Sequence, residues 1–432
     1  MDKDYELISD FKTWRNENAG IFDYTNVDIT EVTHTTDEED TYYYRTKATN
    51  KIKTCKKHIE IPNEHIILCR ARKNNKKQYE LINVLRKKMK KNIVNIDSLD
   101  HKMWLVMNSE NKDNKEKYIY KNKSYYLMEN DIIKIGRKKY EIIKLNIPMT
   151  SNSYEDKNSL NDLNKRHGPV FDIQLKPSQY FNETTQKNSN ETVNIEDSDS
   201  NLGYNPEKDC RICFGSDSTE ENPKLKLCNC HNYYHYNCIK QFLKNNITIS
   251  ENHKGTVTAY FCNKFNCEVC KEPFPLKFTI KYNENSELKT YYLIDGLEMP
   301  ENTNYLILES LTYLKDKQNL KNVFVVKLQD SEITIGRSET NDIVDNDISV
   351  SRHHASMQFN QENGEITLVN KSSKFGILVL IKDSIKLFPN ETVYLQIGRT
   401  FVNLVQKEKN LTSEKVEEEE EEKEELKICK NI

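Results

Sequence analysis

The sequence predicts a multidomain α+β protein in which a small cysteine-rich finger is followed by an all-β sandwich. Eight of the eleven cysteines lie between Cys210 and Cys270, mostly in close pairs. Residues 277–408 contain short apolar–polar runs such as "VFVVKL" and "EITLVN", separated by turn residues, which is the pattern of β-strands. A chain of 432 residues is long enough for two or three domains.

Composition limits the possible partners and compartments. Charged residues make up 30% of the chain, yet the net charge is only -3. The N-terminus, "MDKDYELISDFKTW", is polar and acidic, unlike a signal peptide, and the longest apolar run, "FGILVLI" (375–381), is far shorter than the roughly 20 residues of a membrane span. We therefore expect a soluble protein of the cytoplasm or nucleus with no membrane partner. The basic run "RKKMKK" (86–91) fits a solvated helix face better than a nucleic-acid contact.

Shifts in composition divide the chain into six parts. Low apolar content marks the linker, and a run of like charges marks the tail, so both are expected to be disordered. The parts are a polar N-terminal segment (1–50), a basic helix with strand-like runs (51–147), a linker (148–206), the finger (207–276), the β domain (277–408) and an acidic tail (409–432).

The sequence also contains an internal echo. The segment "LMENDIIKIGRKKYEIIKL" (127–145) resembles "LFPNETVYLQIGRTFVNLV" (387–405), with two extra residues before the second Ile-Gly-Arg. Glycine is scarce in this chain, so the repeated Ile-Gly-Arg favours a degenerate copy of the β domain within 51–147. Chance similarity between two strand–turn–strand units is the alternative.

The spacing of cysteine and histidine predicts two metal sites. Eight soft ligands form four close pairs, in the order Cys210–Cys213, Cys228–Cys230, His235–Cys238 and Cys267–Cys270. Such a set suits two tetrahedral Zn²⁺ ions with no position left for a catalytic water. Because so short a run cannot bury a large core, zinc would supply folding free energy on the order of 10 kcal/mol per site.

This C4HC3 order, with "CRIC" at the start and "CEVCKEPFP" at the end, resembles the RING-CH (RING-variant) finger of ubiquitin ligases. The resemblance implies a cross-brace, in which Cys210, Cys213, His235 and Cys238 bind one zinc ion and Cys228, Cys230, Cys267 and Cys270 bind the other. It implies contacts of Ile212, Phe242 and Pro273 with a ubiquitin-conjugating enzyme. Such a ligase has no catalytic residue and forms no covalent intermediate, because it acts by positioning the charged enzyme.

Two features of the finger leave other interpretations open. Four residues separate Cys230 from His235 where RING-CH fingers usually have seven, and Phe265 lies two residues before the seventh ligand. Both features are closer to a PHD finger, which reads histone tails. An inert zinc scaffold is the third possibility, and His231 or Cys262 are possible substitute ligands.

Three short motifs in the β domain resemble the forkhead-associated (FHA) domain, a β-sandwich that binds phosphothreonine peptides. They are Gly336-Arg337, Ser351-Arg352-x-His354-Ala355 and Ser372-Ser373-Lys374-Phe375-Gly376. The resemblance implies that Arg337, Ser351, Arg352 and Lys374 bind the phosphopeptide, while Gly336, His354 and Gly376 are structural. A phosphate presents three acceptor oxygens and a charge of about -1.5 to -2, which guanidinium and hydroxyl groups complement.

Phe375 departs from the FHA pattern, which usually has an asparagine there whose amide holds the main chain of the ligand. A sandwich used only as a scaffold is therefore the alternative for this domain. Together the motifs predict a ubiquitin ligase that recruits phosphothreonine-containing partners. The alternative is a non-catalytic phosphoprotein adaptor.

Overall fold

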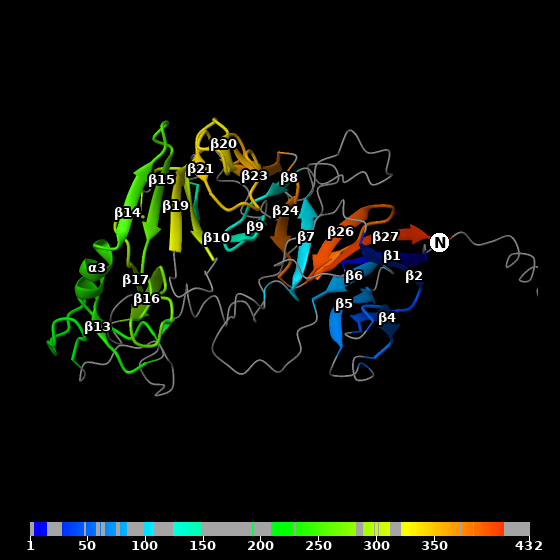
Figure 1. Ribbon diagram of the computed structural model, residues 1–432, viewed down its shortest axis with the longest axis horizontal. Helices are drawn as coiled ribbons and strands as arrows, with labels where there is room; N and C mark the ends of the chain where they lie inside the picture. Colours follow the sequence, from blue (N-terminus) through cyan, green and yellow to red (C-terminus); the bar gives the residue numbers. More distant parts are fainter. Residues whose placement is uncertain are drawn as a thin grey trace, which may run out of the picture.

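The computed structural model consists mostly of β-strands, and its described part contains a single helix, α3 (Tyr236–Lys244) (Figure 1). Within the part of the chain that the structure describes, no helix has the length and apolar character needed to cross a bilayer. The structure describes residues 4–14, 28–46, 49–57, 61, 65–74, 78–83, 99, 101–107, 124–147, 192–193, 209–228, 230–281, 288–297, 299–300, 302–311, 321–371, 373–382 and 384–409. Most of the predicted linker and nearly all of the predicted acidic tail lie outside these residues.

A twelve-stranded antiparallel sheet crosses the whole molecule (Figure 1). Along it, groups of strands from the N-terminal half of the chain alternate with groups from the C-terminal half. In spatial order the strands are β14 (Ile247–Glu251), β15 (Val257–Cys262), β19 (Lys321–Lys327), β18 (Tyr305–Ser310), β10 (Lys138–Asn146), β9 (Ile132–Ile135), β24 (Ile377–Leu380), β7 (Met103–Met107), β26 (Thr392–Ile397), β27 (Thr400–Glu408), β1 (Tyr5–Trp14) and β2 (Ile29–Thr36).

Two five-stranded sheets pack against this large sheet and form two sandwiches. The first sandwich, which contains the N-terminal strand β1, combines β7-β26-β27-β1-β2 with β25 (Ser384–Lys386), β6 (Tyr79–Ile82), β5 (Ile66–Lys73), β3 (Asp40–Arg45) and β4 (Ile52–Cys55). The second sandwich combines β19-β18-β10-β9-β24 with β21 (Ile343–Val344), β20 (Ile333–Gly336), β22 (Ala355–Asn360), β23 (Glu365–Asn370) and β8 (Ser124–Tyr126). One continuous hydrophobic core fills both sandwiches.

The two sandwiches exchange strands. After β7, the chain leaves the first sandwich and contributes β8, β9 and β10 to the second. After β24, the chain leaves the second sandwich and contributes β25, β26 and β27 to the first. At the crossing point β7 and β24 pair with each other, with Met107 opposite Ile377. Each sandwich is therefore completed by strands from the other half of the chain.

The exchanged hairpins are the two segments that echo each other in the sequence. Gly136 and Gly398 form the turns of β9–β10 and β26–β27 with φ of 61° and 57°. Asn130 and Asn390 precede the hairpins with φ of 68° and 61°. Their backbone N–H groups donate to the backbone carbonyls of Ile142 and Gln406, respectively. Positive φ is unfavourable for most side chains, so the shared Gly and Asn positions reflect a shared backbone path.

In the predicted polar segment 1–50, the described residues form the strands β1, β2 and β3. Along β1, inward positions alternate with half-buried ones, but two of the buried side chains are polar, which obscures the pattern in the sequence. The hydroxyl of Ser9 donates to Tyr43, and the hydroxyls of Thr13 and Thr400 lie 3.2 Å apart. Buried hydroxyls are tolerated here because each has a partner.

The predicted basic helix differs from the structure over residues 79–82, which form strand β6. Tyr79 and Leu81 are fully buried, whereas Glu80 between them bonds to Arg72 and Ser384 on neighbouring strands. This alternation has the period of a strand, and pairing with β5 and β25 outweighs the local helical pattern. The helical pattern is "KKQYELINVLRKKMKK" (76–91), of which 76–77 and 84–91 lie outside the described residues.

The cysteine-rich region is joined to the second sandwich through the large sheet. The 28 residues between Cys238 and Cys267 form most of α3 and the hairpin β14–β15, and β15 pairs with β19 over six residues. A second core packs Ile239 and Leu243 of α3 against the sheet residues Ile307 and Val323. This region also contains the two-stranded sheet of β12 (Lys224–Leu225) and β13 (Tyr234–His235). Outside it, β11 (Thr192–Val193), β16 (Lys277–Lys281) and β17 (Leu288–Tyr292) form a three-stranded sheet.

Candidate functional site

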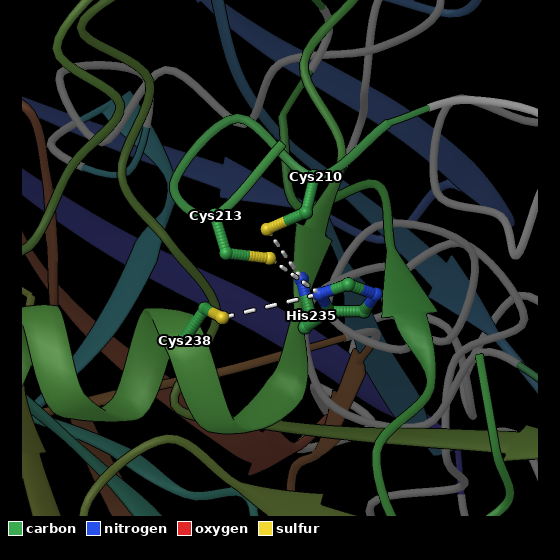
Figure 2. A group of neighbouring side chains, drawn as sticks. All are labelled: Cys210, Cys213, His235 and Cys238. Carbon is green, nitrogen blue, oxygen red and sulfur yellow. Dashed lines mark hydrogen bonds between the residues drawn. The ribbon is translucent and has the colours of Figure 1, made fainter. Parts of the chain in front are cut away.

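The first cluster of soft ligands combines Cys210, Cys213, His235 and Cys238, whose ligand atoms all lie within 4.8 Å of one another (Figure 2). The Nδ1 atom of His235 is 3.1 Å from the sulfur of Cys213 and 3.9 Å from that of Cys238. Cys238 is carried by α3, and His235 ends strand β13 immediately before that helix. The first and third pairs of the sequence thus meet at one point.

The imidazole of His235 is oriented for ligation. Its Nε2 atom contacts the backbone carbonyl of Asp217, which can only accept a hydrogen bond. Nε2 must therefore carry the proton, and the lone pair of Nδ1 faces the three sulfurs. Such a contact on the far nitrogen is how metal-binding histidines are usually held.

The second cluster combines Cys228, Cys230, Cys267 and Cys270, again with all ligand atoms within 4.8 Å. The sulfurs of Cys228 and Cys230 are 3.0 Å apart, and that of Cys230 is 3.6 Å from Cys267. The second and fourth pairs of the sequence are therefore brought together. These two groups could each hold one metal ion.

Polar groups around the second cluster favour the thiolate form of Cys267, whereas burial raises the pKa of Cys228 and Cys270. The side-chain amide of Asn232 donates to Cys230 at 3.1 Å, and the hydroxyl of Tyr234 lies 3.6 Å from the sulfur of Cys267. Burial alone would raise the pKa of Cys267, but backbone N–H groups and the Tyr234 hydroxyl lower it to about 6. A deprotonated sulfur is the form that ligates a metal.

The possible substitute ligands do not join either cluster. Cys262 is completely buried in the core beneath α3, and burial raises the pKa of its thiol to about 12. His231 is exposed. Outside the finger, Cys69 is fully buried and Cys55 is half-buried, and neither belongs to these groups.

The positions expected to contact a conjugating enzyme differ in exposure. Ile212 is 37% exposed between two ligands of the first cluster. Phe242 is only partly exposed, because it packs against the core beneath α3, and Pro273 is half-buried. Two further exposed apolar residues lie beside the ligands and were not predicted, Phe214 at 73% and Val269 at 60%. Their position after "CRIC" and within "CEVC" is the signal that could have found them.

The predicted phosphate-binding loops meet at one edge of the second sandwich. The amide of Arg337 bonds to the carbonyl of Ser351 at 2.9 Å, and the amide of Lys374 lies 3.4 Å from the Ser351 hydroxyl. The amide of Ser338 bonds to the carbonyl of Arg352 at 3.1 Å. Three segments that are distant in sequence are thus joined around Ser351.

The charged side chains of these loops face solvent. Arg337, Arg352 and Lys374 are exposed, whereas Ser351 is half-buried between them. The ammonium group of Lys374 lies 5.5 Å from the centre of the Phe375 ring. An open site with three cations and a hydroxyl is suited to a multiply charged anion.

Buried residues brace the loops from below. A Cβ atom at Gly336 would lie 2.2 Å from the carbonyl oxygen of Arg352, so only glycine fits there. Gly376 has φ of 65°. The side-chain amide of Asn341, a residue that was not predicted, donates to the backbone carbonyls of Ser338 and Arg352, each at 2.7 Å.

His354 links two of the loops as a neutral imidazole. Its Nε2 donates to the carbonyl of Gly376 at 2.9 Å, and its Nδ1 accepts a hydrogen bond from the backbone N–H of Ser351 at 3.0 Å. Burial lowers the pKa of His354 from its usual 6.5, although the bond to Gly376 opposes this. A proton on Nδ1 would remove the acceptor on which the Ser351 amide depends.

The stabilising effect of His354 should therefore depend on pH. Because the folded state favours the neutral ring, the contribution is fully present above pH 6.5 and is lost as the pH falls below that value. We expect His354→Ala to lower the free energy of unfolding by about 2 kcal/mol at pH 7.5, and by less at pH 5.5. Thermal or denaturant unfolding of the full chain at both pH values measures this, with exposed His253→Ala as the control. An effect of His354→Ala that is unchanged or larger at pH 5.5 would contradict the assignment.

Comparison with known proteins gives one similarity. The FHA domain family model matches residues 333–402, a minority of the chain. No curated protein and no solved structure is significantly similar to the chain. The matched segment begins in β20 of the second sandwich and ends in β27 of the first, so it includes one of the exchanged hairpins. The chain is thus similar to FHA domains over the segment that carries Arg337, Ser351, Arg352, His354 and Lys374.

Proposed function

We propose that the protein captures phosphothreonine-containing partners at the loops around Ser351. The observation that carries this proposal is the joining of the three loops around Ser351 by backbone hydrogen bonds, with Arg337, Arg352 and Lys374 exposed on them. The similarity to FHA domains, which bind phosphothreonine peptides, covers these residues. The phenyl ring of Phe375 cannot hold a ligand main chain as an amide would, so we expect modest affinity.

The test is the difference in affinity between a phosphothreonine peptide and its unphosphorylated twin. A peptide library identifies the best sequence, and calorimetry on the full chain measures both forms. The full chain is required because β9 and β10, from the N-terminal half, complete the sandwich that holds the loops. Equal binding of the two peptides would reduce the domain to a scaffold.

We further propose that the two clusters bind zinc as an interleaved cross-brace of the RING-CH type. Three sulfurs and one imidazole nitrogen in the first cluster, and four sulfurs in the second, fit the preference of Zn²⁺ for soft tetrahedral ligands. Bound zinc would hold the loops of the finger in place. All four ligands of each ion would come from the protein, which suits a structural role.

A second candidate function is ubiquitin transfer, with the finger positioning a charged conjugating enzyme. The exposed apolar residues Ile212, Phe214 and Val269, all next to ligands, favour a protein-docking surface over an inert scaffold. The finger is joined to the second sandwich by the pairing of β15 with β19, so a partner bound at the loops would be held on a sandwich that shares the large sheet with the finger. An adaptor without transfer activity is the competing interpretation.

Ile212→Ala should abolish ubiquitin transfer while leaving the metal content unchanged. Ile212 lies between two ligands in the sequence and is 37% exposed, so its loss should affect docking more than folding. An autoubiquitination assay of the full chain against a panel of conjugating enzymes, with metal analysis, measures both effects. Exposed Ile249→Ala on strand β14 is a matched control. If wild-type protein is inactive with every enzyme, the adaptor interpretation replaces this one.

A further inference from the structure

The loop that leads into Ser351 rests on the turn of the exchanged hairpin β9–β10. The backbone amide of Arg137 donates to the hydroxyl of Ser349 at 2.8 Å. The guanidinium of Arg137 donates twice to one carboxylate oxygen of Asp347, at 2.9 Å from Nη2 and 3.2 Å from Nε. Next to this turn, the hydroxyl of Tyr140 bonds to the carboxylate of Asp345. Three residues of one loop, Asp345, Asp347 and Ser349, are thus contacted by a hairpin some 200 positions earlier in the chain.

The same loop determines where Ser351 lies. The carboxylate oxygen of Asp347 that faces Arg137 also accepts hydrogen bonds from the backbone N–H and the hydroxyl of Ser349, at 2.9 and 2.6 Å. The amide of Val350 bonds to the carbonyl of Asp347 at 2.9 Å, and both Ser349 and Val350 are buried. Ser351 follows directly. Any shift of Asp347 is therefore passed to Ser351 through two short, buried residues.

The fit between turn and loop leaves little space. A Cβ atom at Gly136 would lie 2.4 Å from the Ser349 hydroxyl and 2.7 Å from its carbonyl oxygen. Gly136 also has φ of 61°, which few other residues adopt. The glycine allows the hairpin to approach the loop closely, and the arginine that follows it reaches Asp347.

We infer that Arg137 is a positioning residue for the phosphothreonine site, contributed by the N-terminal half of the chain through strand exchange. The inference rests on the proposed function and extends it, because Arg137 lies outside the segment that is similar to FHA domains. Arg137 acts on Ser351 through Asp347 and Ser349. The site is therefore assembled from both halves of the chain.

The other exchanged hairpin supplies a matched control. Arg399 follows Gly398 in the turn of β26–β27, as Arg137 follows Gly136 in the turn of β9–β10. The guanidinium of Arg399 bonds to the side-chain oxygen of Asn50, in the first sandwich. Arg399 thus has the same place in an equivalent turn but supports a different loop.

The experiment compares Arg137→Ala and Arg399→Ala in the full chain by calorimetry with the best phosphothreonine peptide. We expect Arg137→Ala to weaken binding about fivefold and Arg399→Ala to change it by less than about twofold. Arg137→Lys, which keeps a cation beside Asp347, should restore part of the affinity. Thermal unfolding of both alanine variants shows whether their stabilities fall by similar amounts, as the equivalent turns suggest.

A double-variant cycle separates positioning from general destabilisation. If Arg137 acts through Ser351, Arg137→Ala should have less than about a twofold effect in the Ser351→Ala background. Fully additive losses, unchanged affinity in Arg137→Ala, or an equal loss in Arg399→Ala would each overturn the inference while leaving the proposed function intact. A wild-type protein whose binding is indifferent to phosphorylation would overturn both.

Discussion

Arg337→Ala should weaken the binding of a phosphothreonine peptide by about tenfold or more, since hydrogen bonds to charged groups contribute roughly 1.5–3 kcal/mol. Arg337 is exposed at the end of β20, and its backbone is held by the carbonyl of Ser351, so truncating the side chain should leave the loop intact. Affinity for the unphosphorylated twin should hardly change. Calorimetry of the full chain with both peptides measures these four affinities.

Three further variants make this result specific. Arg72→Ala removes an equally charged, exposed side chain from the first sandwich and should leave affinity unchanged. Ser351→Ala should cost less than Arg337→Ala, because it removes a neutral donor. Phe375→Asn should raise affinity by supplying an amide for the ligand main chain. Full binding in Arg337→Ala would show that the cations around Ser351 are only loop architecture.

The 432-residue chain should contain two zinc ions, and removing them should unfold the finger before the sandwiches. The eight ligands are grouped four by four, and structural zinc contributes on the order of 10 kcal/mol per site. A strong chelator should therefore accelerate hydrogen exchange in α3, whereas β9 and β24, in the centre of the large sheet, should stay protected. Elemental analysis and hydrogen-exchange mass spectrometry measure the two effects.

Single cysteine variants test which thiols hold the metal. Cys270→Ser, at an exposed ligand of the second cluster, should reduce the content from two ions toward one. Cys55→Ser, at a half-buried thiol outside both clusters, should leave two ions bound. Equal metal loss in both variants, or fewer than two ions in folded wild-type protein, would contradict the assignment.

The candidate sites were largely accessible from the sequence, because their chemistry depends on local spacing. Two close pairs of cysteines can ligate a metal only if the chain between them turns back, and the structure places Cys228 and Cys230 beside Cys267 and Cys270. Likewise, a glycine is needed at position 336 because the backbone of Arg352 leaves no room for a Cβ atom there. Residues that brace these sites through side chain–backbone bonds, such as Asn341, have no comparable signal, since asparagine is common in loops.

The strand exchange was decided by tertiary structure alone. The sequence revealed that 127–145 and 387–405 are alike, but two hairpins with the same turn present nearly the same edge of backbone N–H and C=O groups. Which sandwich each hairpin completes depends on side-chain fit across the sheets, such as Arg137 on Asp347 and Arg399 on Asn50. These contacts join residues more than 200 positions apart, and no local pattern encodes them. The sequence therefore predicted which groups could bind metal and phosphate, whereas only the folded chain brings the N-terminal hairpin β9–β10 onto the loop that leads to Ser351.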